Sequence, residues 1–472
     1  MSAKKVSLFL TLVLSTACQK QVLIDYQQIP ADRVSISLTP NQPGLRIPSG
    51  FTGLGFETDM LTGSALAETN TALVRMVKLL GAQGSIRIGG VSTDQLFWTG
   101  RPRNGSTDVD SLYTDDVTRL FAFTKATGWK VLFALNLAQS TTAKTTEEAE
   151  YVVASGGSNL SALELGNAPD TYTEQGLRPS GFANTDFQNE WDSFYTSVHP
   201  EVPKTAFAGP CTNNNMAWLL PFIPAESTRV ALITNHYYRT GSPTSSSATV
   251  THLLETDGTL LTDLTEAMAA CRTAGIPLRM EECNSVAGGG KKGVSNTFAS
   301  ALWGLDFMYI LAGAGVTGVN FQGNDNSYYS PLSITPTDVT AQPLFYGMLC
   351  FQLGSQGRFI PLALSNTSNL NVTAYAVLAD NGKITLTVIN KNSTVNADLT
   401  ITAGIPLTSA GYITLASAAA SLTATSGITL GGNAVKSNGD FTTPVYTPIT
   451  QITGDTALIT VPAASAMVIS LQ

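Results

Sequence analysis

The chain changes its pattern of apolar and polar positions near residue 350, and the two parts predict different architectures. Between about residues 50 and 345, short apolar, β-branched runs alternate with longer amphipathic stretches. This order is typical of strand–helix units around a parallel sheet. From about residue 355 onward, period-two runs such as 371–378 and 383–390 predict antiparallel strands, and helix signals disappear.

The number of predicted strands in the first part selects the kind of sheet. Strands are expected at residues 51–57, 85–89, 130–136, 161–166, 204–208, 229–234, 276–282 and 315–322. Helices are expected at residues 71–80, 115–127, 146–154, 187–198, 264–274 and 297–312. Eight strand–helix units within roughly 250–300 residues indicate a (β/α)8 TIM barrel of the α/β class. We therefore predict a catalytic barrel at 46–347 and an appended antiparallel β-sandwich from 25–45 plus 348–472, with residues 33–38 as its first strand.

The amino terminus predicts export from the cell. Lys4 and Lys5 precede the apolar run 6–14, and the small residues of Ser15-Thr16-Ala17-Cys18 follow. This pattern indicates a signal peptide at residues 1–17 and a secreted, extracellular or periplasmic protein. Residues 14–18 also resemble a bacterial lipoprotein box, so a lipid anchor at Cys18 is the alternative. No later run of 18 or more apolar residues predicts a membrane span.

Composition and charge narrow the function classes. Of the 472 residues, 43% are hydrophobic and 13% charged, which excludes a disordered chain or a coiled coil. The net charge of −8 argues against binding to nucleic acid or to an anionic membrane. Five cysteines and three histidines without a CxxC motif predict neither a disulfide scaffold nor a metal site. We expect a monomer that needs no cofactor.

Polar residues gather where the predicted barrel strands end, which is where barrels place their active sites. Strand one ends at Glu57, strand two runs into Asp94, and strand three ends at Asn136. Strand four ends in Leu163-Glu164-Leu165-Gly166-Asn167-Ala168-Pro169-Asp170, strand six in Asn235-His236-Tyr237-Tyr238, and strand seven in Glu281-Glu282. Strands four and seven face each other across a closed eight-stranded barrel, so side chains at their ends are expected to act on one bound group.

These residues resemble a family of retaining glycosidases. The segment 163–170 is similar to the Asn-Glu-Pro motif of barrel glycosidases, and Glu282 followed by Gly288-Gly289-Gly290 resembles glycoside hydrolase family 79, the β-glucuronidases and heparanases. Arg87-Ile88-Gly89-Gly90, Thr93-Asp94, Leu135-Asn136 and His236-Tyr237-Tyr238 match in order. The resemblance covers most of the barrel and implies a retaining exo-β-glucuronidase acting on small-molecule or oligosaccharide glucuronides.

The resemblance also implies residue roles. Glu282 would be the nucleophile, and position 168 would carry the acid/base. Asn167 would bind the sugar 2-hydroxyl, and Asp94 the outer ring hydroxyls, with a loop cap as the alternative for Asp94. Asn136 and His236 would belong to the same substrate site.

Three further positions are implied to recognise the uronic acid. The Gly288 and Gly289 amides and the Tyr329 hydroxyl would meet the sugar carboxylate, while an ordinary flexible loop is the alternative for the glycines. Either Tyr237 or Tyr238 would hold Glu282 ionised, and the other would be a core residue. Side-chain alternation places Glu281 on the opposite face of its strand.

Position 168 departs from the family pattern. An alanine can neither protonate a leaving oxygen nor activate water, so the chain is expected to be strongly impaired, and Glu164 is too deep in the strand to substitute. The retention of Asn167, Pro169, Asp170 and Glu282 favours a deliberate Glu-to-Ala substitution over natural loss. Three alternatives remain: a barrel glycosidase for another sugar such as a xyloside or glucoside, a natural uronide-binding protein without catalysis, or a structural ion pair of Glu282 with Arg279 or Lys291.

Overall fold

A computed structural model describes residues 31–324, 327–335 and 338–472 of the chain. The predicted signal peptide at 1–17 and the candidate lipidation site Cys18 lie outside these residues. None of the described helices combines the length and the apolar character needed to cross a bilayer.

Eight parallel strands close into a barrel, which confirms the predicted fold class. Their order around the barrel is β10-β11-β2-β3-β6-β7-β8-β9. The bounds are β2 Thr52–Glu57, β3 Ser85–Gly89, β6 Lys130–Leu135, β7 Leu160–Leu165, β8 Phe207–Thr212, β9 Val230–Thr240, β10 Leu278–Val286 and β11 Val319–Gly323. β8 begins later than predicted because residues 202–205 form a turn, in which the Thr205 N–H donates to the Val202 carbonyl at 3.0 Å. β9 extends past residue 234 because it continues to pair with β10.

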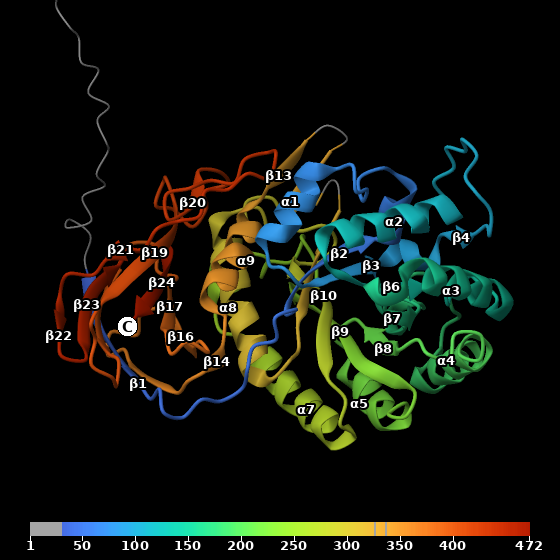
Figure 1. Cartoon of the computed structure of the whole chain (residues 1–472). Coiled ribbons are helices and arrows are strands. Elements are labelled where there is room, and N and C mark those ends of the chain that lie inside the picture. The colour runs from blue at the N-terminus through green and yellow to red at the C-terminus, as the bar shows by residue number, and fades with distance from the viewer. Residues whose placement is uncertain (1–30, 325–326, 336–337) are drawn as a thin grey trace, which may run out of the picture.

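Helices surround the barrel (Figure 1). They are α1 Thr71–Leu79, α2 Thr114–Thr127, α3 Thr142–Gly156, α4 Asn184–Val198, α5 Met216–Ala225, α6 Val250–Leu254, α7 Gly258–Ala274, α8 Phe298–Ala314 and α9 Pro343–Gly354. The sequence did not predict α5, because Pro221 and Pro224 disfavour a helix and its residues are apolar on nearly every face. The predicted domain boundary at residue 347 falls inside α9.

Two sheets form the sandwich. The first has the order β15-β1-β18-β23-β22, and the second β14-β16-β17-β24-β19-β20 with β21 on β19. The bounds are β1 Ala31–Leu38, β14 Arg358–Phe359, β15 Leu362–Ser365, β16 Val372–Leu378, β17 Ile384–Asn390, β18 Asn396–Thr402, β19 Ala410–Ser417, β20 Ile428–Leu430, β21 Thr447–Pro448, β22 Ile452–Thr453, β23 Thr456–Val461 and β24 Ser465–Leu471. Val34 and Ile401 of the first sheet share a core with Leu386 and Ile469 of the second.

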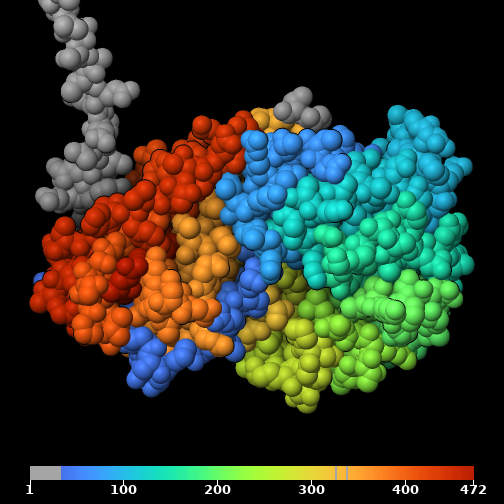
Figure 2. Space-filling view, viewed as in Figure 1, coloured from blue at the N-terminus to red at the C-terminus, as the bar shows by residue number. Residues whose placement is uncertain are grey.

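The sandwich is antiparallel except at one pair, where β1 runs parallel to β18. β1 comes from before the barrel, and Figure 2 shows this blue N-terminal segment against the orange and red strands of the C-terminal part. Since β1 is not joined to β18 by a hairpin, the two strands are free to run in the same direction. Two short sheets lie outside both bodies, β4 Phe97–Trp98 with β5 Ser111–Leu112, and β12 Leu332–Ile334 with β13 Val339–Ala341.

Helix α8 joins the two bodies. It lies with α9 between the barrel and the sandwich (Figure 1). Nearly all of its residues are buried. Asp306 on α8 forms a buried ion pair with Lys391 at 2.7 Å and accepts a hydrogen bond from Tyr375 at 2.7 Å. A helix that is covered on both sides has no amphipathic face, which explains its apolar sequence. The sandwich therefore holds one wall of the barrel in place.

Candidate active site

Glu282 lies in the middle of β10, which continues to Val286 and not to the predicted end at residue 282, and it is held by two donors. Its Oε1 accepts a hydrogen bond from the Tyr238 hydroxyl at 2.8 Å, and its Oε2 accepts one from Arg87 Nη1 at 2.5 Å. Burial alone would raise the pKa of Glu282, but the neighbouring His236 and Arg87 and the Tyr238 hydrogen bond outweigh it and lower that pKa. The carboxylate is therefore ionised and fixed in direction. Its partner is Arg87, whereas Arg279 binds Asn320 and backbone carbonyls.

Arg87 of β3 connects four groups inside the barrel. Besides Glu282, its guanidinium donates to Glu164 Oε2 at 3.2 Å, to Asn167 Oδ1 at 2.7 Å and to Cys211 Sγ at 2.9 Å. The side chain is fully buried. Gly89 leaves room for it, since a Cβ there would lie 2.2 Å from the guanidinium carbon. The sequence matched Arg87 to the family but gave it no role, because nothing local to β3 shows which carboxylates it meets.

Glu281 enters the barrel interior, and the prediction that it faces outward is wrong. The pairing of β10 with β9 shifts register between Met280 and Glu282, as a β-bulge does. The shift breaks the alternation of side chains, so Glu281 reaches His236 Nε2 at 3.1 Å while Glu282 lies 3.6 Å from His236 Nδ1. Burial would lower the pKa of His236, but the two glutamates raise it. His236 therefore links consecutive carboxylates.

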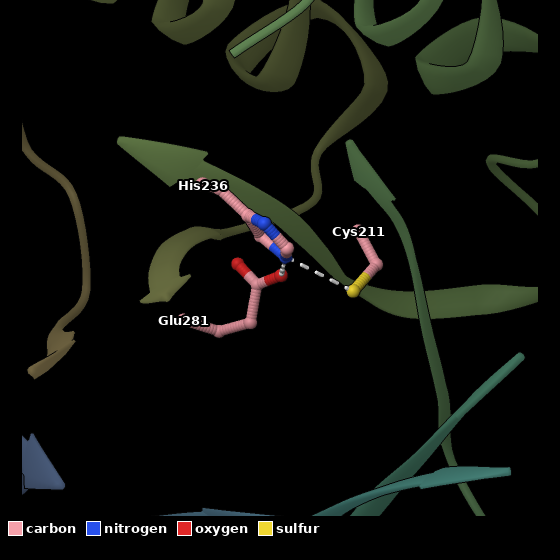
Figure 3. Close-up of side chains that lie close together, drawn as sticks. All are labelled: Cys211, His236 and Glu281. Carbon is pink, nitrogen blue, oxygen red and sulfur yellow. Dashed lines mark hydrogen bonds and ion pairs between the residues drawn. The ribbon is translucent and has the colours of Figure 1, made fainter. Parts of the chain in front are cut away.

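Cys211 completes a buried group with His236 and Glu281 that the sequence did not predict (Figure 3). Cys211 Sγ lies 3.3 Å from His236 Nε2, and one ligand-type atom from each residue lies within 4.8 Å of the others. These are metal-ligand types. However, Arg87 Nη2 is 2.9 Å from Cys211 Sγ, and its positive charge opposes a cation at this point. The group therefore fits a hydrogen-bonded support beneath Glu282 better than a metal centre.

Ala168 lies three residues after the end of β7 and directly before a short 3₁₀ helix at Pro169–Thr171. Its φ is +46°, its N–H donates to the Cys211 carbonyl at 2.9 Å, and it is 6% exposed. Asn167 beside it is fixed through Oδ1, which accepts from Arg87 and from the Gly90 N–H at 3.0 Å. Glu164 lies deeper and is fully buried; burial raises its pKa to about 7, although Arg87 opposes the rise. The segment 163–170 therefore holds Asn167 in a fixed position, whereas position 168 carries only the methyl group of alanine.

Asp94 and Asn136 hold loops together. Asp94 is 1% exposed, and its carboxylate accepts hydrogen bonds from the N–H groups of Leu137, Ala138 and Asn167 and from the Tyr172 hydroxyl. Asn136 donates to the Leu96 carbonyl and accepts from the Gln139 N–H, both at 2.9 Å. These contacts occupy the groups that a sugar hydroxyl would need, so the geometry favours the loop-cap alternative for Asp94 and a structural role for Asn136.

The two tyrosines after His236 face opposite sides. Tyr238 points inward to Glu282, whereas the Tyr237 hydroxyl donates to Asp257 at 2.6 Å and its ring stacks on Phe307. Tyr329 lies beside Tyr238, with ring centroids 6.2 Å apart. Burial and the nearby Glu282 and Glu57 raise the pKa of Tyr329, so its hydroxyl remains protonated. Tyr238 and Tyr329 therefore form one wall of the site.

The glycine run lies in the turn after β10. Gly288 and Gly289 have φ values of +68° and +86°, a conformation that favours glycine. Gly288 is exposed, and the Gly289 carbonyl accepts from the Tyr328 N–H at 2.7 Å, which connects the turn to the segment that carries Tyr329. The turn can therefore present backbone amides beside the tyrosine wall.

Glu57, the last residue of β2, lies at the candidate site, but no role was predicted for it. Its Oε2 accepts from the Ser92 N–H at 3.0 Å and hydroxyl at 2.8 Å, and its Oε1 accepts from Gln322 at 3.1 Å. Burial and the charge of Glu282 raise the pKa of Glu57. Gly90 makes room for it, because a Cβ there would lie 2.3 Å from the carboxyl group. The sequence feature that could have indicated Glu57 is an acidic residue at the last position of a barrel strand.

Sequence comparisons place the chain near β-glucuronidases. No protein-family model matches it. It is 26% identical over 365 residues to a β-glucuronidase from Aspergillus niger, covering 68% of this chain and 66% of that protein. It is 25% identical over 226 residues to a β-glucuronidase from Neurospora crassa, covering 41% and 39%. The chain thus aligns with less than two thirds of the length of either relative, and the predicted resemblance to β-glucuronidases is confirmed.

Solved structures show the same fold. A 4-O-α-L-rhamnosyl-β-D-glucuronidase from Fusarium oxysporum 12S, in complex with Rha-GlcA, has a TM-score of 0.72 at 18% identity and covers 94% of this chain and 100% of that chain. An α-L-arabinofuranosidase from Thermotoga maritima has a TM-score of 0.71 at 14% identity, covering 93% and 99%. The chain therefore shares its overall fold with these two solved proteins over more than nine tenths of its length.

Proposed function

We propose that this chain recognises β-D-glucuronides in a retaining glycoside hydrolase site that lacks its acid/base at position 168. The observation that carries the proposal is the state of Glu282. It is an ionised carboxylate in the middle of β10, the seventh barrel strand, fixed by Arg87 and Tyr238. A carboxylate in this state and place is prepared to attack an anomeric carbon.

The reaction would take place in two steps, of which the first needs a proton donor and the second needs a base. First, a Glu282 oxygen bonds to C1 of the sugar as the C1–O bond to the leaving group breaks, and the bonding electrons go to the leaving oxygen. Ala168 provides no proton, so only leaving groups that are stable as anions depart quickly. Second, water attacks C1 and releases Glu282, and this step needs a base that Ala168 cannot provide. The glycosyl-enzyme should therefore persist.

Recognition of the sugar would use groups around Glu282. Asn167 is fixed through its Oδ1, so its amide N–H group is the part available to the sugar 2-hydroxyl. The Gly288 and Gly289 amides and the Tyr329 hydroxyl would bind the uronic acid carboxylate, because a buried anion needs donors. The similarity to β-glucuronidases supports this choice of sugar.

The test restores the missing acid. Hydrolysis of 4-nitrophenyl β-D-glucuronide is measured for the chain and for Ala168→Glu, with the matching glucoside and xyloside as alternative substrates and Glu282→Gln in the Ala168→Glu background as the control. We expect Ala168→Glu to raise the rate by about 10² to 10⁴ on the glucuronide alone. Glu282→Gln should remove that gain.

A second measurement uses the chain without substitution. With 2,4-dinitrophenyl β-D-glucuronide, added azide should attack C1 of the glycosyl-enzyme, form a C–N bond and release Glu282 as the carboxylate. Turnover should then rise with azide, and Glu282→Gln should show no rise. Restored hydrolysis of the glucoside or xyloside would point to another sugar. If glucuronate binds but neither Ala168→Glu nor azide produces turnover, the chain is a uronide-binding protein.

A further inference from the structure

A cavity lies outside the barrel, where the helices around the barrel meet the sandwich. Its volume is about 220 Å³, and it is bordered by β9, the segment from α6 to α7, helix α8 and the sandwich strand β16. Figure 1 shows α7 and α8 next to each other. Tyr237 lines this cavity, whereas the next residue, Tyr238, points inward to Glu282. None of the roles proposed above uses this space.

Most of the residues that line the cavity are apolar or aromatic. Leu253, Leu254 and Leu260 line it and are buried. Leu261 also lines it and is 43% exposed, so solvent reaches the cavity at α7. A molecule that removes such apolar surface from water gains free energy by doing so. The lining therefore favours an apolar ligand.

Stacked rings among the lining residues favour an aromatic ligand in particular. Phe307 stacks on Trp303 with 5.2 Å between the ring centroids, and on Tyr237 with 5.0 Å. Tyr375 adds a further ring from the sandwich. Aromatic rings attract one another in offset-stacked and edge-to-face arrangements beyond the gain from buried area. A flat aromatic molecule would therefore find partners here that a saturated molecule of the same size would not.

The charged residues of the lining indicate that the ligand is neutral. Arg239 pairs with Asp257 at 3.0 Å, and Lys391 pairs with Asp306 at 2.7 Å. Glu255, the remaining charged residue of the lining, is exposed to solvent. A charged ligand would have to leave water and then compete with a pair that is already formed. An aromatic ring needs no such exchange, because a cation is attracted to its face.

The volume of the cavity limits the size of the ligand. A cavity of about 150 Å³ lined by Leu, Ile and Phe can bind benzene. Sites for drug-sized ligands commonly measure about 300–1,000 Å³. At about 220 Å³, the cavity lies between these cases and fits a molecule of one or two rings.

We propose that this cavity is a binding site for a small neutral aromatic molecule of one or two rings, such as a phenol or a naphthol. The bound ring would contact α7 and α8 of the barrel and β16 of the sandwich at the same time. It would therefore stabilise the junction that Asp306 and Lys391 already hold together. The site requires neither Glu282 nor the recognition of a glucuronide, so it goes beyond the proposed function.

The test measures binding of three related ligands to the full chain at pH 7. Calorimetry is carried out with 2-naphthol, with its saturated analogue decahydro-2-naphthol, and with the anion 2-naphthoate. We expect one equivalent of 2-naphthol to bind with a dissociation constant below about 1 mM. The saturated analogue should bind about threefold or more weakly, and the anion about tenfold or more weakly. Saturating 2-naphthol should also raise the thermal midpoint of the chain.

Three variants locate the bound molecule. Leu261 on α7 and Ile310 on α8 both line the cavity, so Leu261→Trp and Ile310→Trp should fill part of it and weaken binding of 2-naphthol about tenfold or more. Leu458 of β23 is 44% exposed, close to the 43% of Leu261, and does not line the cavity. Leu458→Trp is therefore the matched control and should leave binding unchanged. Thermal midpoints measured without ligand establish which variants are folded.

Each result supports the site or overturns it. If 2-naphthol shows no saturable binding, the site is overturned. If it binds equally well to every folded cavity variant, it occupies another part of the chain, and the proposal fails as well. If decahydro-2-naphthol or 2-naphthoate binds as tightly as 2-naphthol, the assignment to a neutral aromatic ligand is wrong.

Discussion

β10 and β7 lie three positions apart in the closed barrel and differ in the groups they carry. At β10, the glutamate is present, and Arg87, Tyr238 and His236 all act on its charge. After β7, Arg87 and Asp94 hold Asn167 in place, yet the next residue is Ala168. In the proposed mechanism, holding a carboxylate ionised and transferring a proton are therefore separate tasks, which different strands perform.

The largest expected effect comes from replacing Arg87, whose guanidinium pairs with Glu282 of β10 and with Glu164 of β7. Arg87→Met would leave Glu282 and Glu164 buried without their counter-charge, which typically costs about 3–5 kcal/mol. We expect urea unfolding at pH 8 to show a loss of this size. The lowered pKa of Glu282 means that its stabilisation is present above the unfolded pKa and is lost as the pH falls through the folded one.

The Arg87→Met loss should therefore be smaller at pH 4 than at pH 8. The double variant Arg87→Met/Glu164→Gln is the control, because it removes one of the two unpaired carboxylates. It should recover part of the stability at pH 8. Equal losses at both pH values, with no recovery in the double variant, would show that Arg87 contributes packing and not charge.

A smaller effect separates the two tyrosines. Tyr238→Phe removes a hydrogen bond to a charged group, worth about 1.5–3 kcal/mol, and should raise the pKa of Glu282. In the Ala168→Glu background we expect kcat/KM for the aryl glucuronide to fall by about 10- to 150-fold. The acid limb of the pH profile should move to higher pH.

Tyr237→Phe is the matched control for that experiment, because its hydroxyl donates to Asp257 and not to Glu282. It should leave the acid limb in place. A shift of the limb in Tyr237→Phe, or its absence in Tyr238→Phe, would contradict the assignment of the inward tyrosine.

The smallest effect concerns His236 between the two glutamates. Its pKa is raised in the folded chain, so its stabilisation is complete below the unfolded pKa and is lost as the pH rises through the folded one. Thermal midpoints measured between pH 6 and pH 9 should fall with rising pH, and His236→Asn should reduce this slope. The same slope in both proteins would assign the pH dependence to other groups.

Much of the fold was predictable because its signals are local. Alternating strand and helix patterns predicted the barrel, and the loss of helix signals predicted the sandwich. The α5 helix escaped prediction because Pro221 and Pro224 contradict a helical pattern that tertiary packing nevertheless stabilises. The parallel pairing of β1 with β18 joins distant parts of the chain, which no local pattern reports.

The sequence alone determined which chemical groups are present at the end of each strand. Its resemblance to barrel glycosidases also implies that Glu282 is the nucleophile and that Ala168 stands where the acid/base is expected. Only the tertiary structure decided where neighbouring side chains point. The register shift in β10 turns Glu281 inward, Tyr238 and not Tyr237 reaches Glu282, and Asp94 is occupied by loop amides. The physical reason is that side-chain alternation is a property of one strand, whereas bulges, buried charge pairs and loop hydrogen bonds depend on partners that are distant in the sequence.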